Sequence, residues 1–181
     1  MPIHCFCLFD TPIGACAIAW GTDAIVGVLL PEDDPAQTPA RMQRRFPDAV
    51  AAIAPGWVQA VIGRVQHLLE GRGPDDLADV PLDMSGVPEF NQRVYRLARS
   101  IAPGQTLSYG EVAAQLGEPG AARAVGQALG HNPFAPIVPC HRVLAAGKRA
   151  GGFSAGGGVA TKLRMLQIEK AQLGDGPGLF D

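Results

Sequence analysis

A change in composition near residues 84–88 is the feature that most constrains how this chain can fold. Before it, three apolar segments separated by turn-forming residues are predicted to be neighbouring strands, at residues 3–9, 14–20 and 24–30. Helices are expected at residues 40–46 and 57–69, and a last short strand at residues 80–83. Three adjacent strands followed by helices predict a small α/β domain over residues 1–85. Three arginines of the first helix are expected on a solvated face: Arg41, Arg44 and Arg45.

Beyond the boundary the pattern is helical. Apolar residues at helical spacing predict a helix over residues 88–100. Ser108 and Glu111 form a capping box that starts a second helix, which ends at Gly117. After a tight turn, a third helix is expected over residues 121–130. Two short helices joined in this way predict a helix-turn-helix, although any helical hairpin gives the same pattern.

An extended run over residues 136–143, a glycine-rich loop over 147–158 and a final helix over 159–172 are expected to complete a second domain. This domain therefore spans residues 86–172. The glycine- and proline-rich tail, residues 173–181, is expected to be frayed.

Charge is divided unevenly along the chain. Residues 1–87 contain 11 acidic and 5 basic side chains, whereas residues 88–171 contain 10 basic and 4 acidic ones. A basic C-terminal half suits contact with a polyanion, although a scatter of solvated charges gives the same counts. The sequence contains no apolar run long enough for a membrane span and does not begin like a signal peptide, so we expect a cytoplasmic protein.

The run from Ile137 to Val143 places Cys140 between Pro139 and His141 inside an apolar stretch. Apolar neighbours normally leave a cysteine inert, whereas an adjacent histidine lowers the thiol pKa toward neutrality. Pro139 donates no hydrogen bond, so the thiol is expected at a chain reversal and not within a strand. These features favour a nucleophilic cysteine; the alternative is a buried structural cysteine.

The other cysteines, Cys5, Cys7 and Cys16, are predicted to share one face of the first hairpin. With His4 nearby they invite a zinc site, but no Cys-x-x-Cys spacing supports one. We therefore expect small residues buried in a sheet, and no metal.

Five blocks surround Cys140 in a fixed order. They are TLSYGE at 106–111, ARAVG at 122–126, Asn132-Pro133, PCHRV at 139–143, and a loop at 152–158 that precedes Lys162 and Glu169. Together they resemble the O6-alkylguanine-DNA alkyltransferases, or methylated-DNA–protein-cysteine methyltransferases, in which a cysteine takes an alkyl group from guanine O6. The resemblance covers residues 87–170. It implies a ribonuclease-H-like N-terminal domain and a C-terminal, winged-helix-like domain that carries DNA binding and the active site.

The resemblance also implies residue roles. Cys140 is the nucleophile, His141 takes its proton through a water, Glu169 orients the imidazole, and Asn132 ties the helix-turn-helix to the active-site turn. Substrate and DNA contacts are expected from Tyr109, Arg123, Arg142, Val143, Phe153, Ser154 and Lys162. Among these, Tyr109 would donate to the flipped base, and Arg123 would enter the stack that the base leaves. The Val143 carbonyl would accept from the guanine amine, while the Ser154 N–H and Lys162 would stabilise the leaving oxygen.

The implied partner is double-stranded DNA carrying O6-alkylguanine, with activity on O4-alkylthymine left open. No cofactor, membrane or obligate protein partner is expected, and the protein should be a monomer. Because the product on Cys140 is a thioether, which water and ordinary thiols do not cleave, each molecule should react once.

The match to the family loosens in the loop. Phe153 replaces a common tyrosine, and Ala155-Gly156 resembles a two-residue insertion that could widen the pocket mouth. We therefore predict tolerance of larger O6-alkyl groups.

Three other functions would leave different marks on the sequence. A lesion sensor that only recruits other repair would lack the cysteine. A cysteine hydrolase normally brings its cysteine and histidine together through the fold and not as chain neighbours. A transcription regulator would bind a specific sequence without a lesion.

Overall fold

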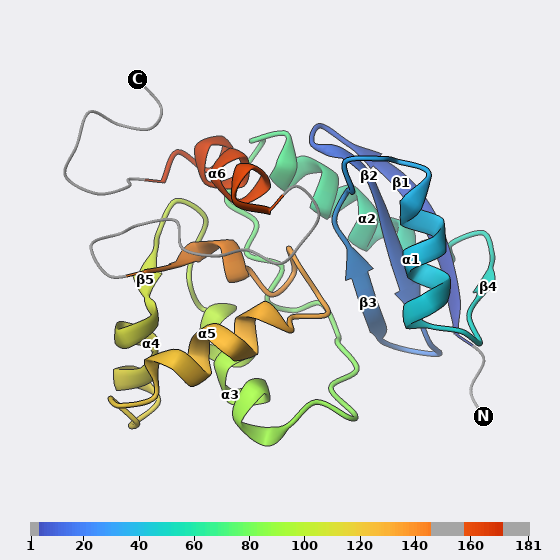
Figure 1. The fold of residues 1–181 in the computed structure, drawn as a ribbon. Coiled ribbons are helices and arrows are strands. Elements are labelled where there is room, and N and C mark those ends of the chain that lie inside the picture. The colour runs from blue at the N-terminus through green and yellow to red at the C-terminus, as the bar shows by residue number, and fades with distance from the viewer. Residues whose placement is uncertain (1–3, 146–157, 172–181) are drawn as a thin grey trace.

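The computed structural model describes residues 4–145 and 158–171. Its N-terminal half contains a four-stranded sheet in the order β3-β2-β1-β4 (Figure 1). Strands β1 (Cys5–Thr11) and β2 (Gly14–Trp20) form an antiparallel hairpin, and β3 (Ile25–Leu29) pairs antiparallel with β2. The three strands predicted first are thus confirmed: β2 has the predicted ends, and the ends of β1 and β3 differ by one or two residues.

The rest of this half differs in detail from the prediction. Strand β4 (Val50–Ala51) lies parallel to β1 and was missed, because two residues are too few to show a period. The strand expected at residues 80–83 is only a single parallel bridge between Ile25 and Leu82. Helix α1 (Gln37–Arg45) begins three residues before its predicted start.

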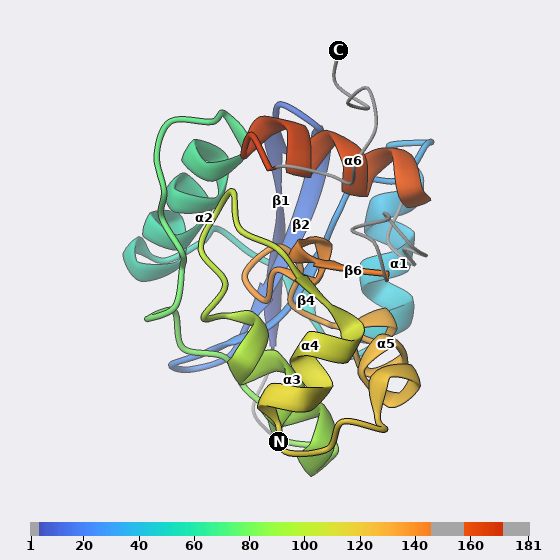
Figure 2. The ribbon, with the colours of Figure 1, turned by 90° about the vertical axis from the view of Figure 1, so that its left-hand side faces the viewer.

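Two helices cover opposite faces of the sheet (Figure 2). Residues that pair across β1 and β2 share a face, so Cys7 and Cys16 lie with Ile18 and Trp20 on the side that packs with α2 (Gly56–Leu69). Met42 of α1 packs on the other side, against Phe6, Ala17, Ala19, Val26 and Leu29. The sheet is therefore the middle layer of a helix-sheet-helix arrangement.

The C-terminal half is built from short helices, namely α3 (Glu89–Ala98), α4 (Tyr109–Gln115), α5 (Ala122–Gly130) and α6 (Gly158–Ile168). The capping box is confirmed: the Glu111 N–H donates to Ser108 Oγ, and the Ser108 N–H donates to the Glu111 carboxylate. Gly117, with φ of +79°, follows the end of α4 in the left-handed conformation that glycine adopts readily.

The extended run predicted over residues 136–143 is wrong. The chain turns repeatedly there and forms a 3₁₀ helix, η1 (Cys140–Arg142), before the two-residue strand β6 (Val143–Leu144). Strand β6 pairs parallel with β5 (Leu107–Ser108). The apolar run reflects burial on all sides and not a strand period, whereas the predicted chain reversal at Cys140 is confirmed.

The largest cluster of buried apolar residues crosses the expected domain boundary. This cluster extends from Ile18 and Val61 in the N-terminal half to Val94, Val125 and Met165 in the C-terminal half. The halves are also joined through the backbone, because the Val28 N–H donates to the Pro133 carbonyl at 2.9 Å.

Gly27, next to this bond, allows close approach. A Cβ placed there would lie 2.5 Å from the Phe46 ring. The result is a mixed α/β molecule with its two halves in contact through a continuous core. In the two described segments, no helix is both long enough and apolar enough to cross a membrane.

Candidate active site

Cys140 lies on a turn that is fixed by backbone hydrogen bonds. Its N–H donates to the Val138 carbonyl at 2.8 Å, and the Arg142 N–H donates to the Pro139 carbonyl at 2.9 Å. The side chain of Asn132 spans the same segment, with Nδ2 donating to the Val138 carbonyl at 2.8 Å and Oδ1 accepting from the Phe134 N–H at 2.9 Å. The end of α5 is thereby tied to the cysteine turn, in the position that the sequence predicted for Asn132.

His141 and Glu169 form a buried pair. His141 Nε2 lies 2.8 Å from Glu169 Oε1, the imidazole is fully buried and the carboxylate is 4% exposed. Burial acts to raise the pKa of Glu169, but His141 and Arg142 outweigh it and lower that pKa to about 2. The carboxylate is therefore ionised, and an ionised carboxylate requires Nε2 to carry the proton.

The remaining imidazole nitrogen, Nδ1, can accept a proton. Burial lowers the pKa of His141, against the opposing effect of Glu169, so the ring is neutral at neutral pH. His141 Nδ1 is buried and has no hydrogen-bond partner among the described residues. A neutral ring with its proton fixed on Nε2 presents a lone pair on Nδ1.

The resting thiol corrects one prediction. Burial raises the pKa of Cys140, and this effect outweighs those of Asn132 and Lys162, which lower it. The expectation that His141 moves this thiol pKa toward neutrality is therefore wrong, because a neutral, buried imidazole supplies no charge. Cys140 holds its proton until a base removes it.

The DNA contact predicted for Arg142 is wrong. The side chain of Arg142 is 1% exposed. Its Nη2 donates to Glu169 Oε1 at 2.7 Å, its Nε donates to Oε2 at 3.0 Å, and its Nη1 donates to the Ile101 carbonyl at 2.8 Å. The guanidinium thus holds both carboxylate oxygens of Glu169, and this pairing needed a partner 27 residues away that the local motif did not reveal.

Lys162, Val143 and Tyr109 lie beside this network. Lys162 Nζ donates to the Val143 carbonyl at 2.9 Å and lies 5.8 Å from the centre of the Tyr109 ring. Burial lowers the pKa of Lys162 to about 8. Burial, followed by the proximity of Cys140, raises the pKa of Tyr109, so its hydroxyl keeps its proton.

The other predicted contact residues are placed as follows. Arg123 is exposed on the first turn of α5. Phe153 and Ser154, together with the Ala155-Gly156 insertion, lie outside the described residues. The structure therefore brings together Cys140, Asn132, His141, Glu169, Arg142, Val143, Lys162 and Tyr109.

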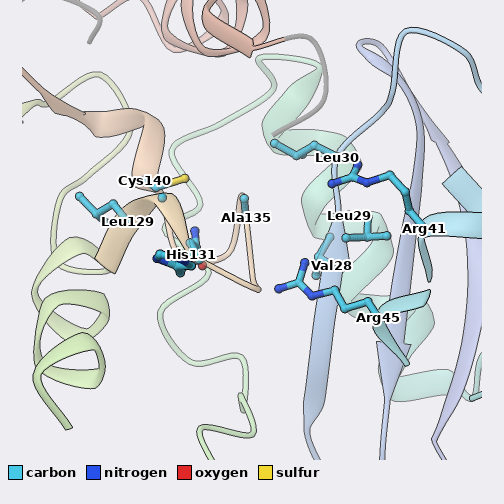
Figure 3. A pocket seen from close by; sticks show the side chains of 11 residues that line it. Val28, Leu29, Leu30, Arg41, Arg45, Leu129, His131, Ala135 and Cys140 are labelled. Carbon is cyan, nitrogen blue, oxygen red and sulfur yellow. The ribbon is translucent and has the colours of Figure 1, made fainter. Parts of the chain in front are cut away.

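A pocket of about 290 Å³ opens beside Cys140. Leu129 and Asn132 line it from the C-terminal half, and Leu30, Arg41 and Arg45 from the N-terminal half. Figure 3 shows the Cys140 sulfur directed toward the side on which the two arginines lie. The solvated face predicted for the arginines of α1 is confirmed for Arg44 and Arg45, which are exposed, whereas Arg41 is half-buried. Nothing local in the sequence indicates that α1 lies beside this pocket.

The other cysteines lie away from this network, on β1 and β2. Cys16 is buried in the core, and Cys5 and Cys7 are half-buried at its edge. Among residues 4–145 and 158–171, no group of histidine, cysteine and acidic side chains is arranged to hold a metal ion.

Comparisons with known proteins agree on one family. Residues 89–171 match the family model described as 6-O-methylguanine DNA methyltransferase, DNA binding domain. A methylated-DNA–protein-cysteine methyltransferase of Mycobacterium bovis is 50% identical over 103 residues, which cover 57% of this chain and 61% of that protein's length. One of Methanothermobacter thermautotrophicus is 32% identical over 162 residues, covering 90% of this chain and 83% of the relative. The crystal structure of Mycobacterium tuberculosis OGT in complex with DNA has a TM-score of 0.74 at 35% identity and covers 92% of both chains.

Proposed function

Since this chain belongs to the family of methylated-DNA–protein-cysteine methyltransferases, we propose that it repairs double-stranded DNA by taking the alkyl group of O6-alkylguanine onto Cys140. The observation that carries this proposal is the arrangement of three buried groups. They are a thiol, a neutral imidazole whose Nδ1 has no partner in the described part of the chain, and an ionised carboxylate that accepts from Nε2. A displacement at saturated carbon needs a sulfur nucleophile and a base that can remove its proton, and these groups supply both.

The thiol is activated at the moment of reaction. His141 Nδ1 takes the Cys140 proton, directly or through one water, and the imidazolium that forms is stabilised by Glu169. The Cys140 sulfur then bonds to the alkyl carbon as the bond from that carbon to O6 breaks. The displaced guanine gains a proton. In the net reaction the alkyl group moves from guanine O6 to the Cys140 sulfur, and the thiol proton moves to the guanine.

Arg142 contributes by holding the carboxylate. With both oxygens of Glu169 engaged by its guanidinium, the carboxylate stays ionised and in line with His141 Nε2. Arg142 is therefore a positioning residue, which acts through Glu169 and His141.

The base must leave the helix to reach Cys140. Arg123 is exposed at the start of α5. We propose that its side chain fills the space that the flipped base leaves in the DNA, because a planar guanidinium can stack on the neighbouring bases. Tyr109, which keeps its proton, would donate to the flipped base. The Val143 carbonyl already accepts from Lys162 and retains a second lone pair for the guanine amine.

Finer features of the architecture belong to the same proposal. We assign the N-terminal half, residues 1–85, to a ribonuclease-H-like domain, and residues 86–172 to a winged-helix-like domain that binds DNA as a monomer. The sheet order, and α4 and α5 joined by a short turn, support this assignment. Light scattering of the free protein and of its complex with a short duplex tests the stoichiometry.

Each molecule is proposed to act once. The thioether on Cys140 is stable to thiols, and the other three cysteines lie on β1 and β2. Mass spectrometry after incubation with a duplex containing one O6-methylguanine tests the proposal. We expect one methyl group on the Cys140 peptide, in equal amount to the guanine restored. Tight lesion binding with no mass change would instead indicate a sensor and would contradict alkyl transfer.

A further inference from the structure

The pocket beside Cys140 has a charged wall that transfer of a methyl group does not use. Leu30 and Leu129 give it apolar surface suited to a small alkyl group. Arg41 and Arg45, both on α1, bring two guanidinium groups to the same space. A methyl group has no charge for them to recognise, so their presence needs another explanation.

The two arginines differ in how their charge is balanced. Arg41 forms an ion pair with Glu32. Arg45 has no carboxylate partner among the described residues, and its guanidinium lies 5.8 Å from the centre of the Phe46 ring. Burial, together with repulsion from Arg41, lowers the pKa of Arg45. Because Glu32 pairs with Arg41 and no described carboxylate pairs with Arg45, this wall of the pocket carries a net positive charge. It belongs to an otherwise acidic half of the chain.

The Arg41 and Arg45 side chains are oriented to contact a group attached to the Cys140 sulfur. Figure 3 shows both guanidinium groups extending from α1 toward the side of the pocket formed by the cysteine turn, while the Cys140 sulfur is directed back toward them. A short substituent on that sulfur would extend into the space between these groups. If the far end of the substituent were an anion, it would accept charge-assisted hydrogen bonds from these guanidinium groups.

We propose that Arg45, with Arg41, forms a subsite for O6-alkyl groups that end in a carboxylate, of which O6-carboxymethylguanine is the simplest. This inference rests on the proposed alkyl transfer and specifies its substrate class. The Cys140 sulfur bonds to the methylene carbon, the bond from that carbon to guanine O6 breaks, and guanine gains the thiol proton. The carboxylate stays on the transferred group, and the product is an S-carboxymethylcysteine.

A pair of lesions of equal size tests the subsite. One duplex carries O6-carboxymethylguanine and the other O6-carbamoylmethylguanine, which replaces the carboxylate with a neutral amide. The single-turnover transfer rate is measured for each by mass spectrometry of the Cys140 peptide. We expect the wild-type protein to prefer the carboxylate, and Arg45→Met to reduce the ratio of the two rates about tenfold, the loss expected for one charge-assisted hydrogen bond.

Matched variants separate charge in the pocket from charge on the helix. Arg44 is exposed on α1 and does not line the pocket, so Arg44→Met removes the same charge and should keep the ratio. Arg45→Lys keeps the charge but loses the planar fork, and should give an intermediate ratio. Circular dichroism confirms that each variant is folded.

Each outcome has a defined meaning. An unchanged ratio in both Arg45→Met and Arg41→Met would overturn the subsite while leaving methyl transfer intact. Equal slowing of both lesions, with weaker duplex binding, would show that the arginines contact DNA phosphates and would also overturn it. If the wild-type protein did not transfer a methyl group either, the proposed function itself would fail.

Discussion

Two buried thiols in this molecule have opposite surroundings. Cys16 lies in the sheet with no exposed surface, among apolar side chains, and its sulfur lies 3.8 Å from the Thr11 hydroxyl. Cys140 is 5% exposed, but the turn that carries it is bounded by Asn132, His141 and Lys162. Burial raises the pKa of both thiols, that of Cys16 to about 12.

The resting pKa therefore does not distinguish the proposed nucleophile, Cys140, from a structural cysteine. Neither thiol is ionised at neutral pH, so neither is a free nucleophile before substrate arrives. What distinguishes Cys140 is a neutral base beside it and a carboxylate that stabilises the base once it is protonated. The proposed alkyl transfer therefore depends on where the Cys140 proton can go and not on a preformed thiolate.

The largest expected effect separates the two thiols directly. Cys140→Ala should abolish alkyl transfer and keep lesion binding, because the bond-forming atom is gone. Cys16→Ala should transfer at the wild-type rate and lose about 1 kcal/mol of unfolding free energy, the value of one small buried group. Peptide mass spectrometry and urea unfolding measure the two effects. A methyl group found on Cys16 would contradict the comparison.

The base should account for the next largest effect. His141→Gln removes the proton acceptor beside Cys140, and we expect the single-turnover rate to fall by about 10² to 10⁴. Rapid-quench measurement with an O6-methylguanine duplex gives the rate, and binding of the same duplex is the control. A rate within a factor of two of wild type would show that Cys140 does not need this base.

A third prediction concerns the ion pair of Arg142 with Glu169, which holds the carboxylate beside His141. Arg142→Met leaves Glu169 buried without its guanidinium and should lower the unfolding free energy by about 3 to 5 kcal/mol. The same substitution at Arg64 should cost much less, because water screens its pair with Asp75 and Asp79. Urea unfolding measures both.

A readout besides stability separates positioning from folding alone. Arg142→Lys keeps a cation but not the two-oxygen contact, so the protein should fold and transfer more slowly. The acidic limb of its rate profile should also lie at a different pH, because the His141 pKa depends on Glu169. A normal rate and pH profile in this variant would leave Arg142 with a structural role only.

The smallest expected effect is a dependence of stability on acid. Glu169 has a folded pKa of about 2 against an ordinary value of 4.5, so its contribution is fully present above pH 4.5 and is lost as the pH falls toward 2. The shift corresponds to roughly 3 kcal/mol. Denaturant midpoints across this range, for wild type and Glu169→Gln, should converge at low pH. Parallel curves would show that other carboxylates account for the loss.

The sequence predicted the features that depend on local chemistry. The hairpin of β1 and β2, the capping box at Ser108, and the chain reversal at Cys140 all follow from neighbouring residues. The features it missed depend on distant partners. Arg142 is buried because Glu169 lies on another helix, and Arg41 reaches the pocket because α1 packs beside the cysteine turn. The apolar run before Cys140 was wrongly predicted to be extended, because a turn that is buried on several sides has the same continuous apolar sequence as a buried strand.

The core that crosses residue 85 also affects how the chain is made. During synthesis the N-terminal half emerges first, with β3 and α2 in place before Val94, Val125 or Met165 exists to pack against the same cluster. Part of the apolar surface of this half therefore stays open to water and to other nascent chains until the helices that carry the cysteine turn have left the ribosome. The excess of acidic side chains in residues 1–87 would oppose association of such chains until the second half closes the core.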